Sequence, residues 1–386
     1  MENLPVPFDK RVWNEAKALT RAGYGVSIIS PTGRGYEKRY EEIDGIAVYR
    51  HPLPAEASSP IGYAVEYSVA LFWETVLTFR VLLTRGFDAI HACNPPDMIF
   101  LIGLLFRLFG KKFLFDHHDI NPELYVAKFG RKGLSYYLMI LLERFTFMTA
   151  HISLATNASY REIAILRGKM RPDKVYIVRS GPDLQKFRPV PPDESLKEGK
   201  RYLVGYVGVM GKQEGLNYLL DAASHVLHDR DRKDVLFVII GSGTEFGAIR
   251  EYAKKLGLNR HVRFTGRIPD DELLTYLSTA DVCVNPDVAN EMNDKSTMNK
   301  IMEYMAVGKP VVQFNLTEGR RSAMDASLYA RRNDPIDFAD KVLFLLDNEN
   351  LRRRMGAFGR ERVESVLAWE YSEKVLLEAY RALFSS

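Results

Sequence analysis

Short apolar segments alternate with amphipathic helical segments along nearly the whole chain, and this alternation restricts the fold more than any other feature. In the first half, the apolar segments have the length of buried strands: 25–30, 89–93, 112–117 and 151–156. Between them lie stretches such as 11–23, in which Val12, Ala16 and Leu19 recur at helical spacing. The pattern predicts an α/β protein whose parallel sheets are covered by helices on both faces.

The alternation stops at 187–200, which is rich in proline and charge, and then starts again. The second set of apolar segments is 202–208, 235–241, 262–266, 280–286 and 310–314. At 386 residues the chain exceeds the roughly 250–300 residues at which one core stops growing. We expect two doubly wound Rossmann-like domains facing across a cleft, residues 1–187 and 188–367, and a last helix within 368–386 that crosses back. The site is expected in that cleft, outside the carboxyl ends of the strands.

The start of the chain departs from this pattern. A doubly wound domain opens with a buried central strand, but only Met1 to Leu4 precede the loop at residues 5–11. We therefore expect a truncated first strand, whose loss would lower the stability of the first domain.

Basic and apolar residues are interleaved in the first domain. Residues 98–180 hold 13 Lys and Arg against 6 Asp and Glu, and they include the apolar runs 98–115 and 133–148. Arg107 and Glu143 interrupt these runs, which fall short of the eighteen or more apolar residues of a membrane span. Two buried helices explain the runs as well as peripheral attachment to a membrane does. The excess positive charge fits a solvated face, a membrane-facing surface or a nucleic-acid surface.

The location of the protein is indicated by two weaker signals. Two cysteines, Cys93 and Cys283, form no disulfide framework and have no metal-ligand spacing, which favours a reducing compartment. No secretion signal is recognisable. We expect a cytoplasmic protein, with peripheral contact to the inner face of the cytoplasmic membrane through the first domain.

Residues 293–312 combine a predicted helix with a cluster of charge. Ser296 or Thr297 is expected to cap this helix, Gly308 to end it, and Lys295, Lys300 and Glu303 cluster at its front. Free backbone N–H groups at a helix start attract anions, so this charged cluster is a candidate ligand site.

Several ordered motifs of the chain resemble those of one family: 178–189, 238–246, 262–282, 285–287 and 299–312. Together they resemble the family 4 glycosyltransferases of the GT-B type. The resemblance implies that the C-terminal domain binds a nucleotide-diphosphate sugar, with UDP favoured over GDP, and that the N-terminal domain binds the acceptor. It implies sugar transfer with retention of configuration and without a metal or other cofactor. A glycan or lipid-linked glycan of bacterial polysaccharide or O-antigen synthesis is the expected acceptor.

The family's donor-binding pattern is only partly present. Glu303 matches the glutamate that binds the ribose, but Lys295 stands where a first glutamate is expected. Val209 and Glu214 stand where an arginine and a lysine clamp the donor phosphates. Our hypothesis is that lysines near the helix start replace this clamp, with Lys295 in a catalytic role. The donor-binding residues we expect are Gly208, Lys212, Gly241, Gly243, Arg267, Ser296, Thr297, Asn299, Lys300 and Glu303.

On the acceptor side, a histidine and an aspartate follow a strand. His118 with Asp119 matches the family's active-site histidine motif, and His117 is the competing choice. Further acceptor-binding candidates are His91 at another strand end, and Asp9 and Arg11 at a helix start, where Asp9 also suits a helix cap. The adjacent histidines do not predict zinc, because no further Cys or His has suitable spacing. No role is transferred to Arg320, Arg321 and Asp325, where relatives carry a different motif.

Three other functions fit parts of the sequence. A nucleotide-sugar epimerase shares the architecture but needs acid and base groups around one sugar carbon. A non-catalytic nucleotide-sugar-binding protein could use the same cleft. A nucleic-acid binder would use the basic region, but the apolar residues there look packed rather than arranged for base stacking, so no nucleic-acid partner is expected.

Overall fold

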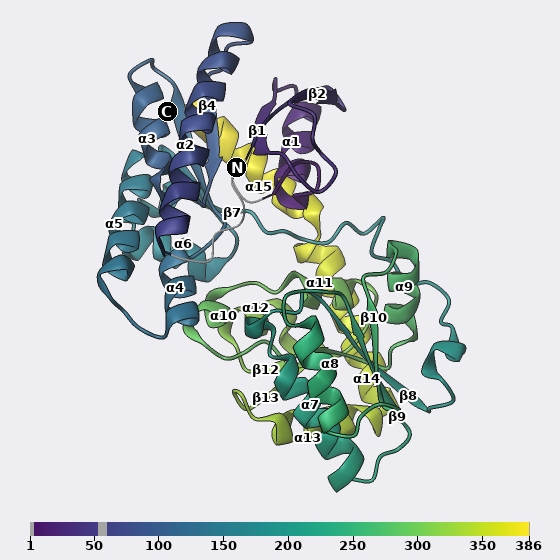
Figure 1. The fold of residues 1–386 in the computed structure, drawn as a ribbon. Helices are drawn as coiled ribbons and strands as arrows, with labels where there is room; N and C mark the ends of the chain where they lie inside the picture. Colours follow the sequence, from purple (N-terminus) through teal and green to yellow (C-terminus); the bar gives the residue numbers. More distant parts are fainter. Residues whose placement is uncertain (1–3, 53–59, 386) are drawn as a thin grey trace. The chain divides into compact units, whose positions relative to one another are not determined.

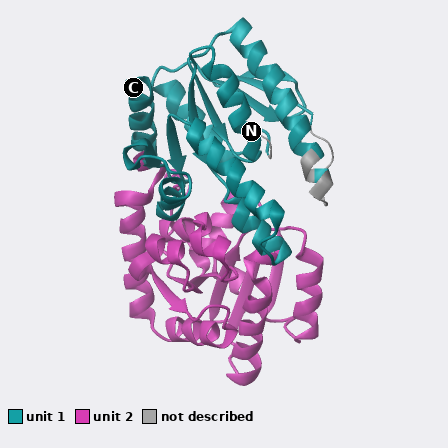
Figure 2. Ribbon diagram, turned by 90° about the vertical axis from the view of Figure 1, so that its left-hand side faces the viewer, with its two compact units in different colours: residues 1–180, 372–386 teal, residues 181–371 magenta. Residues whose placement is uncertain are grey.

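The computed structural model describes residues 4–52 and 60–385 and divides the chain into two compact units. The first unit contains residues 1–180 and 372–386, and the second contains residues 181–371 (Figure 2). Residues 1–3, where the predicted truncated strand would begin, lie outside the described residues. The last helix, α15 (Trp369–Phe384), starts in the second unit and belongs to the first from Ser372 onward.

Two sheets form the first unit, in place of the single parallel sheet that the pattern predicts. The strands are β1 (Ser27–Pro31), β2 (Tyr40–Ile43), β3 (Ile46–His51), β4 (Ala89–Cys93), β5 (Lys112–His117), β6 (Ile152–Ala155) and β7 (Val175–Ile177). One sheet has the order β1-β3-β2 with β2 antiparallel, and the other is parallel with the order β4-β5-β6-β7. Strands β1 and β4 are both sheet edges, and within the described residues no strand joins them by hydrogen bonds.

Helices of the first unit pack on these sheets (Figure 1). They are α1 (Lys10–Arg21), α2 (Pro60–Thr84), α3 (Phe100–Arg107), α4 (Asn121–Phe129), α5 (Leu134–Thr149) and α6 (Ala158–Leu166). Asp9 is the N-cap of α1 and accepts a hydrogen bond from the Val12 backbone N–H at 3.1 Å. The helix buries Ala16 against Ile28 and Val48, so the expected helical spacing does mark its core face.

The second unit contains one six-stranded parallel sheet. Its strands are β8 (Tyr202–Val207), β9 (Val235–Ile240), β10 (Val262–Gly266), β11 (Val282–Asn285), β12 (Val311–Phe314) and β13 (Ser327–Ala330). Its helices are α7 (Leu216–Ser224), α8 (Phe246–Lys255), α9 (Asp270–Thr279), α10 (Glu291–Lys295), α11 (Asn299–Ala306), α12 (Thr317–Ala323), α13 (Pro335–Leu346) and α14 (Glu349–Arg362). All six strands coincide with apolar segments or follow the last predicted one, and their side chains are mostly buried.

The strand order of this sheet, β10-β9-β8-β11-β12-β13, reverses direction between β8 and β11. In doubly wound sheets, ligands bind outside the carboxyl ends of the strands at such a reversal. The loops after β8 and β11 are therefore where a ligand of this unit is expected.

The segment before α11 differs from the prediction. Ser296 and Thr297 do not cap α11, since its N-cap is Met298 and no side chain accepts a capping bond there. Ser296 instead ends the short helix α10, and its hydroxyl donates to the Met292 carbonyl at 2.8 Å. The prediction failed because serine hydroxyls bond equally well to a carbonyl four residues earlier in a helix.

Candidate functional site

Two glycine loops meet at the carboxyl edge of the six-stranded sheet. The Gly208 N–H donates to the Ile240 carbonyl at 3.0 Å, and the Met210 N–H donates to the Ser242 carbonyl at 3.2 Å. Gly241 has a φ of +133°, and a Cβ on it would lie 1.9 Å from the Gly208 carbonyl oxygen. Side chains there would push the loops apart, so these glycines are required by the approach of one backbone to another.

Lys300 lies directly under the first glycine loop. Its Nζ contacts Glu214 Oε2 at 2.6 Å and Asp287 Oδ1 at 2.9 Å, and it lies 4.9 Å from the centre of the Tyr206 ring. The Tyr206 hydroxyl in turn lies 3.2 Å from Glu214 Oε2. The lysine and Asp287 side chains are only 12% and 1% exposed. Glu214 and Asp287 follow β8 and β11, so this ion cluster occupies the strand reversal.

Burial and charge shift the pKa of the groups in this cluster. Burial alone would lower the pKa of Lys300, but Asp287 and Glu214 outweigh it and raise the pKa. Burial raises the pKa of Asp287 to about 7, against the lowering effect of Lys300, and the negative charge of Glu214 adds to the rise. The cluster therefore holds a permanent cation and a carboxyl group that titrates near neutral pH.

Asn285, at the end of β11, supplies an unusual buried amide. Its side chain is 1% exposed, and neither its Oδ1 nor its Nδ2 has a hydrogen-bond partner in the described part of the chain. Oδ2 of the neighbouring Asp287 is also buried without such a partner. Buried polar atoms are normally satisfied, so both side chains retain unused hydrogen-bonding capacity at the edge where a ligand is expected.

Apart from the glycines of the two loops, the other predicted donor-site residues lie away from this cluster or at the surface. Lys295, on α10, forms an ion pair with Glu291 at 2.9 Å, and the two side chains are 28% and 45% exposed. Glu303 is half-buried on α11. Lys212, Arg267 and Asn299 are exposed, and Ser296 and Thr297 are half-buried. Of the predicted donor residues, Lys300 contacts Glu214 and Asp287, and Gly208 lies beside Tyr206 and Lys300.

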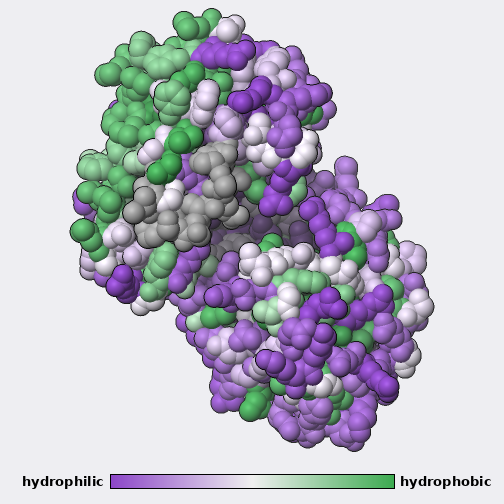
Figure 3. Space-filling view, in the orientation of Figure 1, coloured by the Kyte–Doolittle hydropathy of each residue, from purple (hydrophilic) through white to green (hydrophobic). Residues whose placement is uncertain are grey.

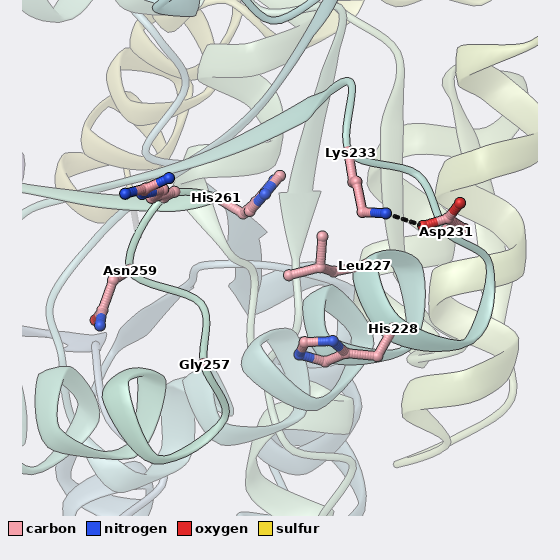
Figure 4. Close-up of a pocket in the computed structure, with 8 residues that line it drawn as sticks. Leu227, His228, Asp231, Lys233, Gly257, Asn259 and His261 are labelled. Carbon is pink, nitrogen blue, oxygen red and sulfur yellow. Dashed lines mark ion pairs between the residues drawn. The ribbon is translucent and has the colours of Figure 1, made fainter.

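A separate depression lies at the opposite end of the strands. It has a volume of about 580 Å³ and is lined by Leu227, His228, Asp231, Lys233, Gly257, Asn259, Arg260 and His261. Figure 4 shows the open arrangement of these side chains, with an ion pair between Lys233 and Asp231. Lys233 and His261 precede β9 and β10, so the depression lies at the amino ends of these strands and away from the glycine loops.

In the first unit, His118 lies in a compact polar cluster after β5. Its Nε2 lies 2.5 Å from Asp116 Oδ2, and the Arg11 guanidinium contacts Asp116 Oδ1 at 2.8 Å and Glu15 Oε1 at 3.2 Å. Arg11 also donates to the Val178 carbonyl at 2.8 Å. The His118 side chain is 15% exposed, whereas those of Asp116 and Glu15 are almost fully buried. Of these four side chains, that of His118 is therefore the most exposed, and its partners are more deeply buried.

The charges of this cluster control the proton on His118. Burial lowers the pKa of His118, but the charge of Asp116 and its hydrogen bond outweigh burial, so the pKa is raised above 6.5. Although burial opposes it, Arg11 and His118 hold the pKa of Asp116 well below its usual range. Burial raises the pKa of Glu15. His118 is thus a cation over a wider pH range than a free histidine.

His117, the competing choice for the active-site histidine, is excluded from an acceptor-binding role. Its side chain is 0% exposed and packs against Phe147 and Tyr160, with ring centres 5.2 and 5.0 Å away. Burial lowers its pKa to about 3. Successive residues of a strand point to opposite faces, so His118 and Asp116 share one face while His117 enters the core on the other.

The remaining acceptor-side residues have mixed outcomes. His91 lies at the edge of the His118 cluster, where its Nδ1 is 2.9 Å from the Tyr380 hydroxyl of α15 and its Nε2 is 3.6 Å from Asp116 Oδ2. Asp119 is half-buried, and burial raises its pKa. Asp9 caps α1. The side chain of Arg11 is only 9% exposed and bonded to carboxylates, so we reassign Arg11 from acceptor binding to the positioning of Asp116.

Glu15, Asp116 and His118 present potential metal-ligating atoms within 4.8 Å of one another. The guanidinium of Arg11 is bonded to both carboxylates of this group and lies 3.0 Å from His118 Nε2. A permanent cation thus already neutralises the carboxylates that a metal ion would need, and the donor set does not fit a metal.

Asp116, Glu15 and Tyr380 are among the cluster residues that the sequence did not single out, and Glu214 was named only as standing where a clamp lysine is expected. Two of them carried a recognisable signal. Asp116 stands two residues before His118, on the same face of the strand, and Glu15 stands four residues after Arg11 on one helix. Tyr380 and Glu214 meet their partners through the tertiary structure alone.

Two family descriptions match this chain and together cover most of it. Residues 188–362 match the glycosyl transferases of group 1, and residues 9–181 match the glycosyl transferase 4-like domain. The chain belongs to the family 4 type of glycosyltransferase. Its two matched regions fall in the two structural units, and the glycine loops, Lys300 and Asn285 fall in the group 1 region.

Individual relatives are distant. A D-inositol 3-phosphate glycosyltransferase of Corynebacterium urealyticum is 28% identical over 54% of this chain and 51% of its own length. The match thus spans about half the length of this curated relative. Sucrose-phosphate synthase of Thermosynechococcus elongatus has a similar structure, with a TM-score of 0.79, 20% identity and coverage of 97% of this chain and 93% of that one.

A second solved structure is Anabaena HepE in complex with UDP-glucose. Its TM-score is 0.71, with 13% identity and coverage of 99% of this chain and 97% of that chain. At such low identities the similarity establishes the fold, which is GT-B, the architecture that the alternating pattern and the resemblance predict.

Proposed function

We propose that this glycosyltransferase-family protein transfers a sugar, with retention of configuration, from a UDP-sugar to a lipid-linked glycan. The acceptor would belong to polysaccharide or O-antigen synthesis at the inner face of the cytoplasmic membrane. Support for the donor comes from the buried Lys300 cluster under two glycine loops at the strand reversal, which is the observation that carries the proposal. UDP is favoured because a protein of the same fold has been solved with UDP-glucose.

The proposed donor site supplies both charge and hydrogen bonds. Lys300 provides the buried cation for the diphosphate, and Asn285 provides unused amide groups beside it. Glu303 on α11 is proposed to bind the ribose. Lys295 lies on α10, and its ion pair with Glu291 is half exposed, so the ammonium could exchange this partner for a phosphate at little cost.

In the proposed reaction, the bond from the sugar C1 to the diphosphate oxygen breaks, and a bond from C1 to the acceptor oxygen forms on the same face. The acceptor proton passes to the leaving phosphate oxygen. The protein contributes positioning and charge. His118, held as a cation by Asp116, is proposed to orient a hydroxyl of the sugar or the acceptor. Glu15 and Asp116 are buried and bonded to Arg11, which leaves neither available as a covalent nucleophile.

The first test is calorimetric binding of UDP, GDP, ADP and TDP in the presence of EDTA. We expect UDP to bind and EDTA to leave its affinity unchanged. Transfer is then followed with UDP-sugars and a polyprenyl-diphosphate glycan, with the product configuration read by NMR. Conversion of the donor to an epimer would indicate an epimerase, and UDP-sugar binding without transfer or hydrolysis would indicate a binding protein. No nucleotide binding at all would refute the donor site.

The role of Lys295 has its own test. If its ammonium joins the donor phosphates, Lys295→Ala raises the KM for the donor or lowers kcat by tenfold or more, on the order of 1.4 kcal/mol. Unchanged kinetics would contradict the hypothesis that Lys295 replaces the missing phosphate clamp. Lys300 would then remain as the donor-site cation.

A further inference from the structure

One side of the first unit is covered by exposed apolar side chains (Figure 3). On α5, the exposed large apolar residues recur at helical spacing: Leu134, Tyr137, Leu138, Leu141, Phe145 and Met148. Leu134 is 87% exposed and Tyr137 is 62% exposed. Single exposed apolar residues are common on protein surfaces, but a row along the whole outer face of a helix marks an interaction site.

Helices α2 and α3 extend this row into a continuous surface. Their exposed large apolar residues are Val65, Phe72, Val76 and Leu83 on α2, and Leu101, Leu104, Leu108 and Phe109 on or just after α3. The rings of Phe79 on α2 and Phe106 on α3 lie 4.8 Å apart, and those of Phe100 on α3 and Phe145 on α5 lie 5.5 Å apart. The three helices are therefore neighbours. We call the exposed residues of α2, α3 and α5 the apolar face.

The exposed charges of residues 98–150, which carry α3 and α5 of the apolar face, are mainly basic. Residues 98–150 contain seven Lys and Arg and four Asp and Glu. Three of these four carboxylates, Asp116, Glu123 and Glu143, are buried, the last two with Arg167. Asp119 is half-buried. The exposed part of this segment is thus apolar and basic, with its acidic groups turned inward.

Helix α2 bears on whether the apolar face would lie on a membrane surface or cross the membrane. The stretch Val65–Thr84 is long and apolar enough to cross a membrane, with a mean hydropathy of 1.2, and only 28% of it is buried. However, Leu77 and Val81 pack against Ala47 and Tyr49 of β3, and Glu74 is 3% exposed. One side of α2 is therefore buried against the rest of the first unit, which leaves the other side to lie in the plane of a membrane surface.

We propose that the apolar face of α2, α3 and α5 docks on an anionic lipid bilayer, with the basic residues of 98–150 against the lipid headgroups. Apolar side chains enter the boundary of the acyl chains while nearby Lys and Arg contact the anionic headgroups. A second copy of this chain fits less well, because a symmetric contact would bring two basic surfaces together. The choice of membrane-bound acceptor in the proposed function rests on this surface, but docking requires no sugar transfer.

The test is co-sedimentation of the full chain with vesicles of phosphatidylcholine alone or with 30 mol% phosphatidylglycerol. We expect binding to the anionic vesicles that weakens with salt. The variant Leu134→Gln/Tyr137→Gln should lose at least tenfold in vesicle affinity, because two exposed apolar side chains no longer enter the bilayer. The matched control, Ile336→Gln/Phe344→Gln, changes residues of the second unit that are 52% and 53% exposed and should bind as the unmodified protein does.

A second variant tests the charge. Arg131→Gln/Arg144→Gln should weaken binding to anionic vesicles by about 30-fold, since each cation near such a surface contributes about 1 kcal/mol and tenfold is about 1.4 kcal/mol. Equal binding to neutral and anionic vesicles, or equal loss in the control variant, would overturn the proposal. So would a lipid-free dimer that Leu134→Gln/Tyr137→Gln dissociates, or resistance of the membrane-bound protein to carbonate extraction, which would indicate that α2 spans the bilayer.

Vesicle binding is read without any activity measurement. A protein that binds anionic vesicles but transfers no sugar would therefore refute the proposed function alone. A protein that transfers sugar to a short soluble acceptor but binds no vesicles would refute only the docking surface.

Discussion

Replacement of Lys300 by methionine tests the buried ion cluster of the second unit most directly. Methionine keeps most of the side-chain length but removes the charge, and it leaves Glu214 and Asp287 without the cation that lies 2.6 and 2.9 Å from them. Breaking a buried ion pair in this way costs about 3–5 kcal/mol of unfolding free energy. We expect Lys300→Met to fall in this range, measured by urea unfolding at pH 8.

The pH dependence follows from Asp287. Its pKa in the folded protein is raised to about 7 by burial, so its neutral form is favoured by folding, and the associated stability is lost as the pH rises through about 7. Without Lys300 this pKa rises further, because the attraction of the cation is gone. The loss in Lys300→Met should therefore be smaller at pH 6, where Asp287 is protonated, than at pH 8.

Two controls make this reasoning refutable. Lys300→Met/Asp287→Asn removes the stranded carboxylate and should recover at least half of the lost stability at pH 8. Lys295→Met removes a lysine whose ion pair with Glu291 is much more exposed, and it should cost less than about 1 kcal/mol. A loss in Lys300→Met that equals that of Lys295→Met, or that does not change between pH 6 and pH 8, would contradict the account of the cluster.

Two further predictions concern single residues. In Asp116→Asn, the pKa of His118 should fall, because the charge and hydrogen bond that raise it are lost while burial and Arg11, which both lower it, remain; NMR titration of labelled histidine measures this, and an unchanged His118 titration would exclude a positioning role for Asp116. Gly241→Ala should cost at least about 2 kcal/mol in urea unfolding, since its Cβ would meet the backbone of the facing loop at 1.9 Å. Gly247→Ala is the matched control, because its Cβ would meet nothing within 4 Å; equal costs in the two variants would show that the glycine loops are not closely packed.

The order of strands and helices could be predicted from the sequence because it depends on local periodicity. The segments 89–93, 112–117 and 262–266 coincide with β4, β5 and β10. Strands β2, β3, β7 and β13 were not predicted. Strand β2, with Glu41 and Glu42, lacks a clear apolar signal. The division of the first unit into two sheets was also not predicted, because pairing between strands depends on residues far apart in sequence.

Which charged groups meet was decided by the tertiary structure alone. Arg11 reaches Asp116 across 105 residues, and Lys300 reaches Glu214 across 86. The sequence identified Lys300 and His118 as candidates by their motifs, and the spacing of Asp116 hinted at a partner for His118, but nothing indicated that Glu214 and Asp287 hold Lys300. It left His117 and His118 as alternatives, and the strand turned one into the core and the other toward the polar cluster. Local periodicity depends on residues that are neighbours in sequence. The charge and pKa of a site depend on partners that only the folded chain brings together.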